Sequence, residues 1–156
     1  MSEKKERGNN TEHSNKKKKI ELNYYLNKIV LKKGKSFKSE SLLDDIYLSL
    51  LKKVRKEPSF IIDKAIKNVM PIFLLRNKKI GKRVISTPFF ILSEHHRKLL
   101  GLKWIIEAAL FKPGKFKENF INEILDALDN KGSVKKKQKD LNIIVLNNRS
   151  NLRYRW

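Results

Sequence analysis

Five basic residues lie around the Gly81-Lys82 dipeptide, within a stretch, residues 64–93, that contains no acidic residue. Ammonium and guanidinium groups bind phosphate oxygens through charge-assisted hydrogen bonds, and arginine forms two such bonds in parallel. This concentration of positive charge therefore predicts contact with a polyanion, with an ordinary surface hairpin of solvated lysines as the alternative. The five residues are Arg76, Lys78, Lys79, Lys82 and Arg83.

The segment that carries these cations, residues 72–91, is predicted to be a β-hairpin. Runs of β-branched and aromatic residues flank Gly81-Lys82, and a two-residue connection with glycine first is typical of a type II′ turn. The turn sets Ile80 opposite Arg83, Lys78 opposite Ile85, Arg76 opposite Thr87 and Leu74 opposite Phe89. We expect the tip to extend from the globule and the apolar base to be buried. The base consists of Ile72, Phe73, Leu74, Leu75, Phe89, Phe90 and Ile91.

Further basic clusters occur in the N-terminal segment, in a loop near Gly34, after the hairpin, and towards the C-terminus. Near the end, aromatic residues alternate with arginines, a pattern that can stack on unpaired bases while the guanidinium groups hold phosphate. Packing of Trp156 against the helices is the alternative for that residue. The predicted contacts outside the hairpin are Lys16, Lys17, Lys18, Lys19, Lys32, Lys33, Lys35, Arg97, Lys98, Lys135, Lys136, Lys137, Arg149, Arg153, Tyr154, Arg155 and Trp156.

The whole chain of 156 residues has a formal net charge of +21. Such a charge opposes compaction unless a polyanion balances it, and nucleic acid is the usual one. A membrane is disfavoured because no run approaches the ~20 apolar residues of a spanning helix. The chain has no cysteine, which excludes disulfides and zinc fingers with cysteine ligands.

Residues suited to catalysis are few, and none forms a recognisable site. His95 and His96 are adjacent, so on a helix they point ~100° apart and cannot hold one metal ion. The pairs Asp44-Asp45 and Asp126/Asp129 lie on the polar faces of predicted helices. Glu107 is expected to form an ion pair with a neighbouring helix. We therefore predict no enzymatic activity, no metal site and no cofactor.

The rest of the chain is predicted to be mainly helical. Apolar residues at helical spacing indicate helices over about residues 20–33, 36–55, 58–70, 93–111, 115–130 (stopped by Gly132) and 134–156. The middle of the last segment has strand propensity, but we predict helix from its flanks. Residues 1–19 are predicted to be a disordered basic tail, either a nucleic-acid arm or a solubilising tail, and residues 20–156 one domain.

The order of several short motifs resembles the small-ribosomal-subunit protein seven family, over about residues 22–156. Each motif is weak alone, but the collinear set is specific. The motifs are Asn68-Val69-Met70-Pro71, Lys78-Lys79-Ile80-Gly81, Trp104-Ile105-Ile106-Glu107-Ala108-Ala109, Glu123-Ile124-Leu125-Asp126-Ala127, Asn130-Lys131-Gly132-Ser133 and the terminal Tyr154-Arg155-Trp156.

The resemblance implies a bundle of about six helices with one protruding two-stranded hairpin. It implies binding to the 3′ major domain of small-subunit ribosomal RNA and early assembly of the subunit head. It also implies a hairpin tip near the exit-site tRNA and the messenger RNA path, with no homo-oligomer. Lys78, Lys79, Gly81, Lys82 and Arg83 would take the tip role.

The chain departs from the family pattern after the hairpin and in its last helix. The junction at residues 92–96 is one residue longer and lacks the expected basic run, leaving Arg97 and Lys98. The last helix carries an unusually apolar stretch, for which we expect a protein partner particular to this lineage. That stretch is Ile143, Ile144, Val145 and Leu146.

Two other functions and several locations stay open. A DNA-architectural protein could use the ribbon as a groove-binding arm, although its tip lacks the usual apolar wedge; an RNA-processing enzyme is the third possibility. The richness in lysine, asparagine and isoleucine is what A/T-rich codons produce. Together with the absence of a presequence, it favours the mitochondrial matrix, ahead of a bacterial cytoplasm or a plastid.

Overall fold

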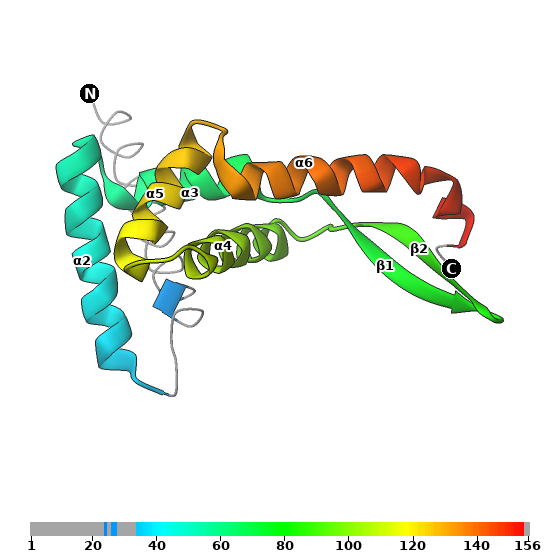
Figure 1. Ribbon diagram of the computed structural model, residues 1–156, viewed down its shortest axis with the longest axis horizontal. Helices are drawn as coiled ribbons and strands as arrows, with labels where there is room; N and C mark the ends of the chain where they lie inside the picture. The colour runs from blue at the N-terminus through cyan, green and yellow to red at the C-terminus, as the bar shows by residue number, and fades with distance from the viewer. Residues whose placement is uncertain (1–23, 25, 28–33, 155–156) are drawn as a thin grey trace, which may run out of the picture. The chain divides into compact units, whose positions relative to one another are not determined.

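A computed structural model describes residues 24, 26–27 and 34–154 (Figure 1). The described residues fall into two compact units, which divide between Asp63 and Lys64. The fold is mainly α-helical with one two-stranded antiparallel sheet, which confirms the predicted fold class.

The first unit is built from helices. Tyr24, Leu26 and Asn27 are helical, and Leu26 is fully buried. Helix α2 (Ser36–Val54) buries Leu43, Ile46 and Leu50 along one face, at the i, i+3, i+7 spacing of an amphipathic helix. It ends at Arg55, whose φ of 52° is left-handed. Helix α3 (Pro58–Val69) begins on its proline, where the missing N–H would have no partner anyway, and runs across the boundary between the units.

The hairpin in the second unit has the predicted register. Strand β1 (Phe73–Ile80) pairs with β2 (Arg83–Phe90), with Ile80 opposite Arg83 and Leu74 opposite Phe89. Gly81 has φ +60°, whereas Lys82 is not in the positive-φ region. A type I′ turn needs positive φ at both positions, so this pattern fits the predicted type II′ turn.

Two helices follow the hairpin and form most of the core of this unit. Helix α4 (Glu94–Phe111) begins as predicted, with the Ser93 hydroxyl accepting a hydrogen bond from the His96 N–H. Helix α5 (Phe116–Leu128) packs against it. The Asn119 side chain donates to the carbonyls of Lys112 and Pro113, at 3.0 and 3.2 Å, and so holds the α4–α5 connection in place.

The end of α5 differs from the prediction that Gly132 stops it. Asn130 is left-handed with φ 57°, its N–H donates to the Ala127 carbonyl, and the Lys131 N–H donates to the Asp126 carbonyl. These are the bonds of a Schellman motif, so Asn130 takes the usual place of glycine. Gly132 instead opens the next helix with φ +85°, where an added Cβ would lie 2.9 Å from the Asp126 Cβ.

The last helix is shorter than predicted, and a tighter turn follows it. Helix α6 (Gly132–Asn147) includes the ambiguous stretch of residues 141–146, which confirms that this stretch is helical. The chain then forms a 3₁₀ helix, η1 (Arg149–Tyr154), beside the ribbon (Figure 1).

The prediction of a buried hairpin base is largely wrong. Ile91 is buried, Leu74 and Leu75 are half-buried, and the other base residues are 36% to 47% exposed. Burial falls instead on Thr87 and Pro88, further along the ribbon. The physical reason is that α6 contacts β1 and η1 contacts β2, so the covered part of the ribbon is its middle, around Thr87 and Pro88, and its base is left partly open. The open residues are Ile72, Phe73, Phe89 and Phe90.

Candidate nucleic-acid interface

The hairpin tip presents three cations without a partner among the described residues. Lys79, Lys82 and Arg83 are exposed, and neither strand contains an acidic residue. The two-residue turn holds these side chains within a few residues of one another, on a backbone fixed by the strand ladder. The tip is therefore a concentrated positive charge that a phosphate can approach without meeting a carboxylate of the ribbon.

Two other predicted cations of the hairpin contact the protein itself. The Lys78 ammonium donates to the Tyr154 carbonyl at 3.2 Å, and Lys78 is half-buried. The Arg76 guanidinium lies over the ring of Phe89, 5.7 Å from its centroid. A cation over an aromatic face keeps its charge, so Arg76 can still face an anion. Lys78 has a structural role in this arrangement.

The C-terminal turn η1 braces the ribbon, a feature that was not predicted from the sequence. The Asn151 side chain donates to the Ser86 carbonyl of β2 at 3.1 Å and to the Asn148 side-chain oxygen at 3.2 Å. With the bond from Lys78, the turn is attached to both strands. A lone two-stranded ribbon is marginally stable in water, so these attachments help to fix the direction of the tip. No local sequence signal marks Asn151, because its partner is a backbone carbonyl 65 residues away.

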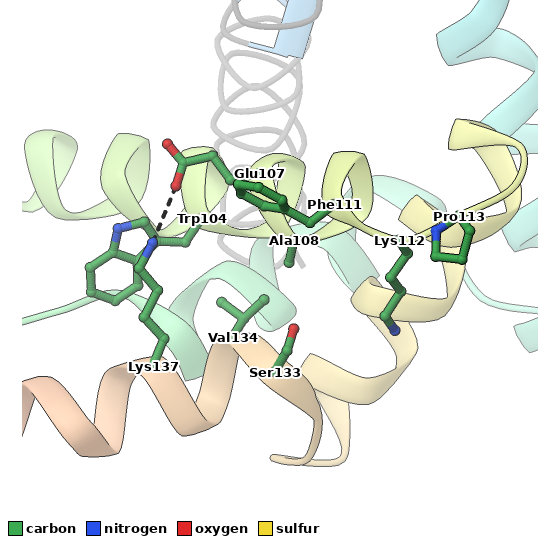
Figure 2. A pocket seen from close by; sticks show the side chains of 9 residues that line it. All are labelled: Trp104, Glu107, Ala108, Phe111, Lys112, Pro113, Ser133, Val134 and Lys137. Carbon is green, nitrogen blue, oxygen red and sulfur yellow. Dashed lines mark hydrogen bonds and ion pairs between the residues drawn. The ribbon is translucent and has the colours of Figure 1, made fainter.

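The three consecutive lysines near the start of α6 have different surroundings. Lys135 is half-buried and donates to the Asn68 carbonyl at 2.7 Å. Lys137 forms an ion pair with Glu107 at 3.2 Å and lies over the Trp104 ring, 5.1 Å from its centroid (Figure 2). Lys136 is exposed and has no partner among the described residues. The predicted interhelical ion pair of Glu107 is confirmed, at the surface.

Of the basic residues after the hairpin, Lys98 also forms an ion pair within the protein. Lys98 pairs with Glu94 at 3.0 Å, one helical turn away. The hydrogen bond and charge of Lys98, with smaller contributions from Arg97 and Lys67, lower the pKa of the Glu94 carboxyl. A phosphate at this end of α4 would therefore have to compete with a carboxylate for Lys98. Arg97 is half-buried.

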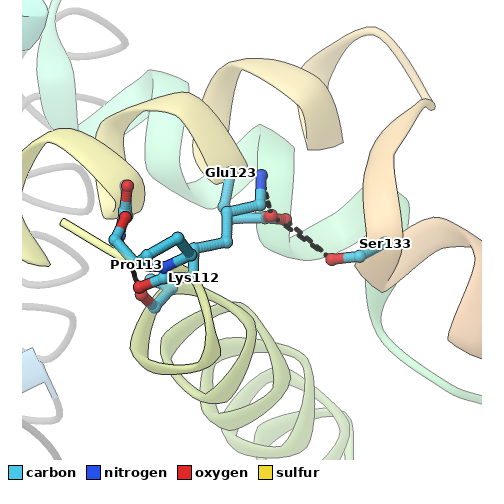
Figure 3. Close-up of polar contacts among 6 residues, drawn as sticks. Lys112, Pro113, Glu123 and Ser133 are labelled. Atoms are coloured by element: carbon cyan, nitrogen blue, oxygen red, sulfur yellow. Dashed lines mark hydrogen bonds and ion pairs between the residues drawn. The ribbon is translucent and has the colours of Figure 1, made fainter.

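A buried carboxylate lies between α4, α5 and α6. Glu123 is 1% exposed and accepts hydrogen bonds from the Lys112 ammonium at 2.6 Å and from the Ser133 hydroxyl at 3.3 Å (Figure 3). Its hydrogen bond and charge raise the pKa of the Lys112 ammonium above its ordinary value. The pair could not be singled out from the sequence, since Glu123 lies in an otherwise ordinary amphipathic helix.

The remaining predicted contacts lie at the surface or outside the described residues. Lys35, Arg149 and Arg153 are exposed, and Tyr154 is 37% exposed. Because η1 contacts β2, Arg153 and Tyr154 belong to the same surface as the hairpin. Outside the described residues are Lys16, Lys17, Lys18, Lys19, Lys32, Lys33, Arg155 and Trp156, together with the tail of residues 1–19.

Other kinds of site find no support among the described residues. None of their histidine, aspartate and glutamate side chains gathers into a group of three that could hold a metal ion. Likewise, no helix in this part of the chain is both long enough and apolar enough to cross a membrane.

A helical body that carries a braced, acid-free cationic ribbon is the kind of architecture that suits contact with a nucleic acid. Comparison of the sequence with models of protein families identifies the family. The model of the family "Ribosomal protein S7p/S5e" matches residues 2–149, nearly the whole chain, and the chain belongs to that family. It is a structural protein of the small ribosomal subunit, located in the ribosome, where it binds small-subunit ribosomal RNA and contacts ribosomal proteins.

Proposed function

We propose that this protein binds the 3′ major domain of small-subunit ribosomal RNA and helps to nucleate assembly of the subunit head. Its hairpin tip is placed near the exit-site tRNA and the messenger RNA path. The body supplies the main RNA contacts, and the ribbon carries positive charge away from it. The family assignment and the resemblance of the hairpin motif support this proposal.

The observation that carries the proposal is the unpaired charge at the tip. Lys79, Lys82 and Arg83 have no partner in the described part of the chain and lie together on one two-residue turn, whereas Lys112, Lys135 and Lys137 are held by carboxylates or a carbonyl. Neutralising phosphates releases counterions, which favours binding and makes it steeply salt-dependent. Where RNA helices converge, cations placed between them reduce phosphate repulsion, and so stabilise the junction.

The second half of α6 supports a contact with a neighbouring ribosomal protein. Ile143, Ile144 and Leu146 are 55%, 45% and 63% exposed, while Val145 is buried. Val145 and Leu146 also line a groove of about 280 Å³ that includes Ile72 and no charged side chain. Such a surface has no cation to neutralise a phosphate, so it suits a protein. We propose that a head protein of this lineage covers it.

The tail and the compartment complete the proposal. The basic residues of the tail order on RNA, which supplies the counter-charge that the isolated segment lacks. The location is the mitochondrial matrix, within the ribosome, with a bacterial cytoplasm or a plastid as alternatives. Sedimentation of organelle extracts, followed by detection of the chain in small-subunit fractions, tests the compartment.

The function is tested by comparing two nucleic acids at equal length and salt. The full chain is titrated with a folded transcript of the 3′ major domain and with a duplex DNA. We expect the RNA to bind at least tenfold more tightly at 0.2 M salt. Equal or stronger binding to the duplex would replace the proposal by the DNA-architectural alternative. Incubating the RNA with magnesium and the protein tests for cleavage; loss of intact RNA would show an RNA-processing enzyme.

A further inference from the structure

The last turn of α4 presents two large apolar side chains to solvent beside a pocket. Phe111 is 89% exposed and Leu110 50% exposed. The pocket has a volume of about 420 Å³ and lies between α4 and α6, with apolar walls that include Trp104, Ala108 and Val134 (Figure 2). Exposed aromatic and aliphatic groups beside an apolar pocket are typical of an interaction surface.

The two lysines of the pocket are already neutralised. Lys112 is held by the buried Glu123 at 2.6 Å, and Lys137 by Glu107 at 3.2 Å. The immediate charge of the site is therefore close to zero, in a chain whose net charge is +21. Affinity for RNA comes largely from phosphate neutralisation, which paired lysines provide poorly. A phosphate at this position would also approach the partly exposed Glu107 carboxylate.

Three exposed lysines lie close in sequence to the residues that line the pocket, and we call them the rim lysines. Lys103, Lys115 and Lys136 are exposed and lack a partner among the described residues, and each is within two residues of a residue that lines the pocket. Leu110, next to Phe111 in the chain, is an exposed aliphatic group and offers no plane for a base to stack on. A neutral apolar centre with a cationic rim is complementary to an apolar side chain flanked by acidic residues.

We propose that the pocket between α4 and α6 binds a protein segment with an aromatic or branched aliphatic anchor and acidic flanks. The anchor contacts Phe111 and Leu110 and enters the pocket against Trp104. The acidic flanks pair with the rim lysines. The surface is rigid, because the Asn119 amide ties down the connection that follows Phe111 and the Glu123 network joins the three helices around it. This inference is independent of the RNA contacts proposed for the hairpin.

The test uses the purified full chain with Trp156→Phe, so that Trp104 is its one tryptophan. The probes are a twelve-residue peptide with a central phenylalanine between glutamates, the same peptide with serine at the centre, and an eight-nucleotide single-stranded RNA. Binding is followed by Trp104 fluorescence and by displacement of a labelled peptide.

We expect the phenylalanine peptide to bind at least tenfold more tightly than the serine peptide. The double variant Leu110→Ser, Phe111→Ser should lose at least tenfold in peptide affinity and keep its affinity for the 3′ major-domain transcript. The matched control is Phe37→Ser, Leu48→Ser, which removes a phenylalanine and a leucine of similar exposure, 82% and 57%, on α2.

Three results would overturn the inference. One is equal binding of the two peptides, or no binding of either. Another is an equal loss of peptide affinity in the control variant. The third is displacement of the peptide by the RNA octamer together with loss of octamer binding in the Leu110, Phe111 variant, which would make the pocket a base-stacking site.

Discussion

The Lys112–Glu123 pair predicts an unequal response to removal of its two partners. Lys112→Met removes the cation and leaves the Glu123 carboxylate buried, with the Ser133 hydroxyl as its remaining polar contact. Glu123→Gln removes the charge but keeps an oxygen that can accept hydrogen bonds from Lys112 and Ser133. The lysine variant should therefore lose more stability than the glutamine variant.

The magnitude follows from the burial of each partner. Removing one member of a buried ion pair costs about 3–5 kcal/mol. Glu123 is 1% exposed, but the Lys112 side chain is 42% exposed, so water weakens the bond and reaches the ammonium. We expect a loss of about 2–3 kcal/mol for Lys112→Met and about 1 kcal/mol for Glu123→Gln. The double variant, which has no buried charge, should be more stable than Lys112→Met alone.

The pH dependence has a definite sign. The pKa of Lys112 in the folded protein is raised above its ordinary value of 10.5. Its charge therefore stabilises the fold fully below pH 10.5, and that stability is lost as the pH rises through the raised value. The difference in unfolding free energy between the wild type and Lys112→Met should be constant at neutral pH and should narrow above pH 10.5.

Urea denaturation of the purified chain measures these differences. The chain carries Trp156→Phe, so the fluorescence of Trp104 reports on the second unit, and circular dichroism at 222 nm reports on total helix. The reasoning would be refuted if Glu123→Gln cost as much as Lys112→Met, or if the double variant were the least stable of the three.

Three further predictions concern the tip, the brace and the first unit. The triple variant Lys79→Ala, Lys82→Ala, Arg83→Ala should leave the helix content unchanged and weaken retention of exit-site tRNA in reconstituted subunits. The slope of log RNA affinity against log salt concentration should fall by about 0.7–0.9 for each phosphate that the tip no longer neutralises. An unchanged slope would mean that the tip contacts no phosphate. Asn151→Ala should cost about 0.5–1.5 kcal/mol and should speed amide hydrogen exchange in β2, whereas equal exchange would show that η1 does not brace the ribbon. Burial, helped by the charge of Asp44, raises the pKa of Tyr47 to about 12. An absorbance titration at 295 nm should therefore show one late tyrosine ionisation step, and this step should be absent in Tyr47→Phe. The stability contributed by the neutral phenol is present below pH 10 and is lost as the pH rises through about 12.

The hairpin and the helices could be predicted because their signals are local. Gly81 defines the turn, and β-branched and aromatic runs define the strands, so the register followed directly. The helices follow from apolar spacing and from Ser93, Pro58 and Pro113. The end of α5 was mispredicted because both Asn130 and Gly132 can adopt positive φ, and only the backbone bonds show which one closes the helix.

The parts that could not be predicted depend on contacts between distant residues. The hairpin base is apolar on both faces, yet its burial depends on where α6 and η1 lie. The same holds for Lys78 and Lys135, which are indistinguishable in sequence from free surface lysines but bind carbonyls 76 and 67 residues away. The exposure of Phe111, 89% at the end of the apolar helix α4, likewise depends on how the neighbouring helices pack and has no local sequence signal.

The most direct test of the proposed RNA contact of the tip uses the absence of native cysteine in the chain. A single cysteine is introduced by Lys82→Cys at the tip, or by Ser41→Cys on α2 as a control, and carries a tethered hydroxyl-radical reagent in reconstituted small subunits. Cleavage from position 82 is predicted in the 3′ major domain and in the exit-site tRNA, with no cleavage of that tRNA from position 41. Intact 3′ major-domain RNA and tRNA around position 82, in subunits that contain the labelled protein, would contradict the account.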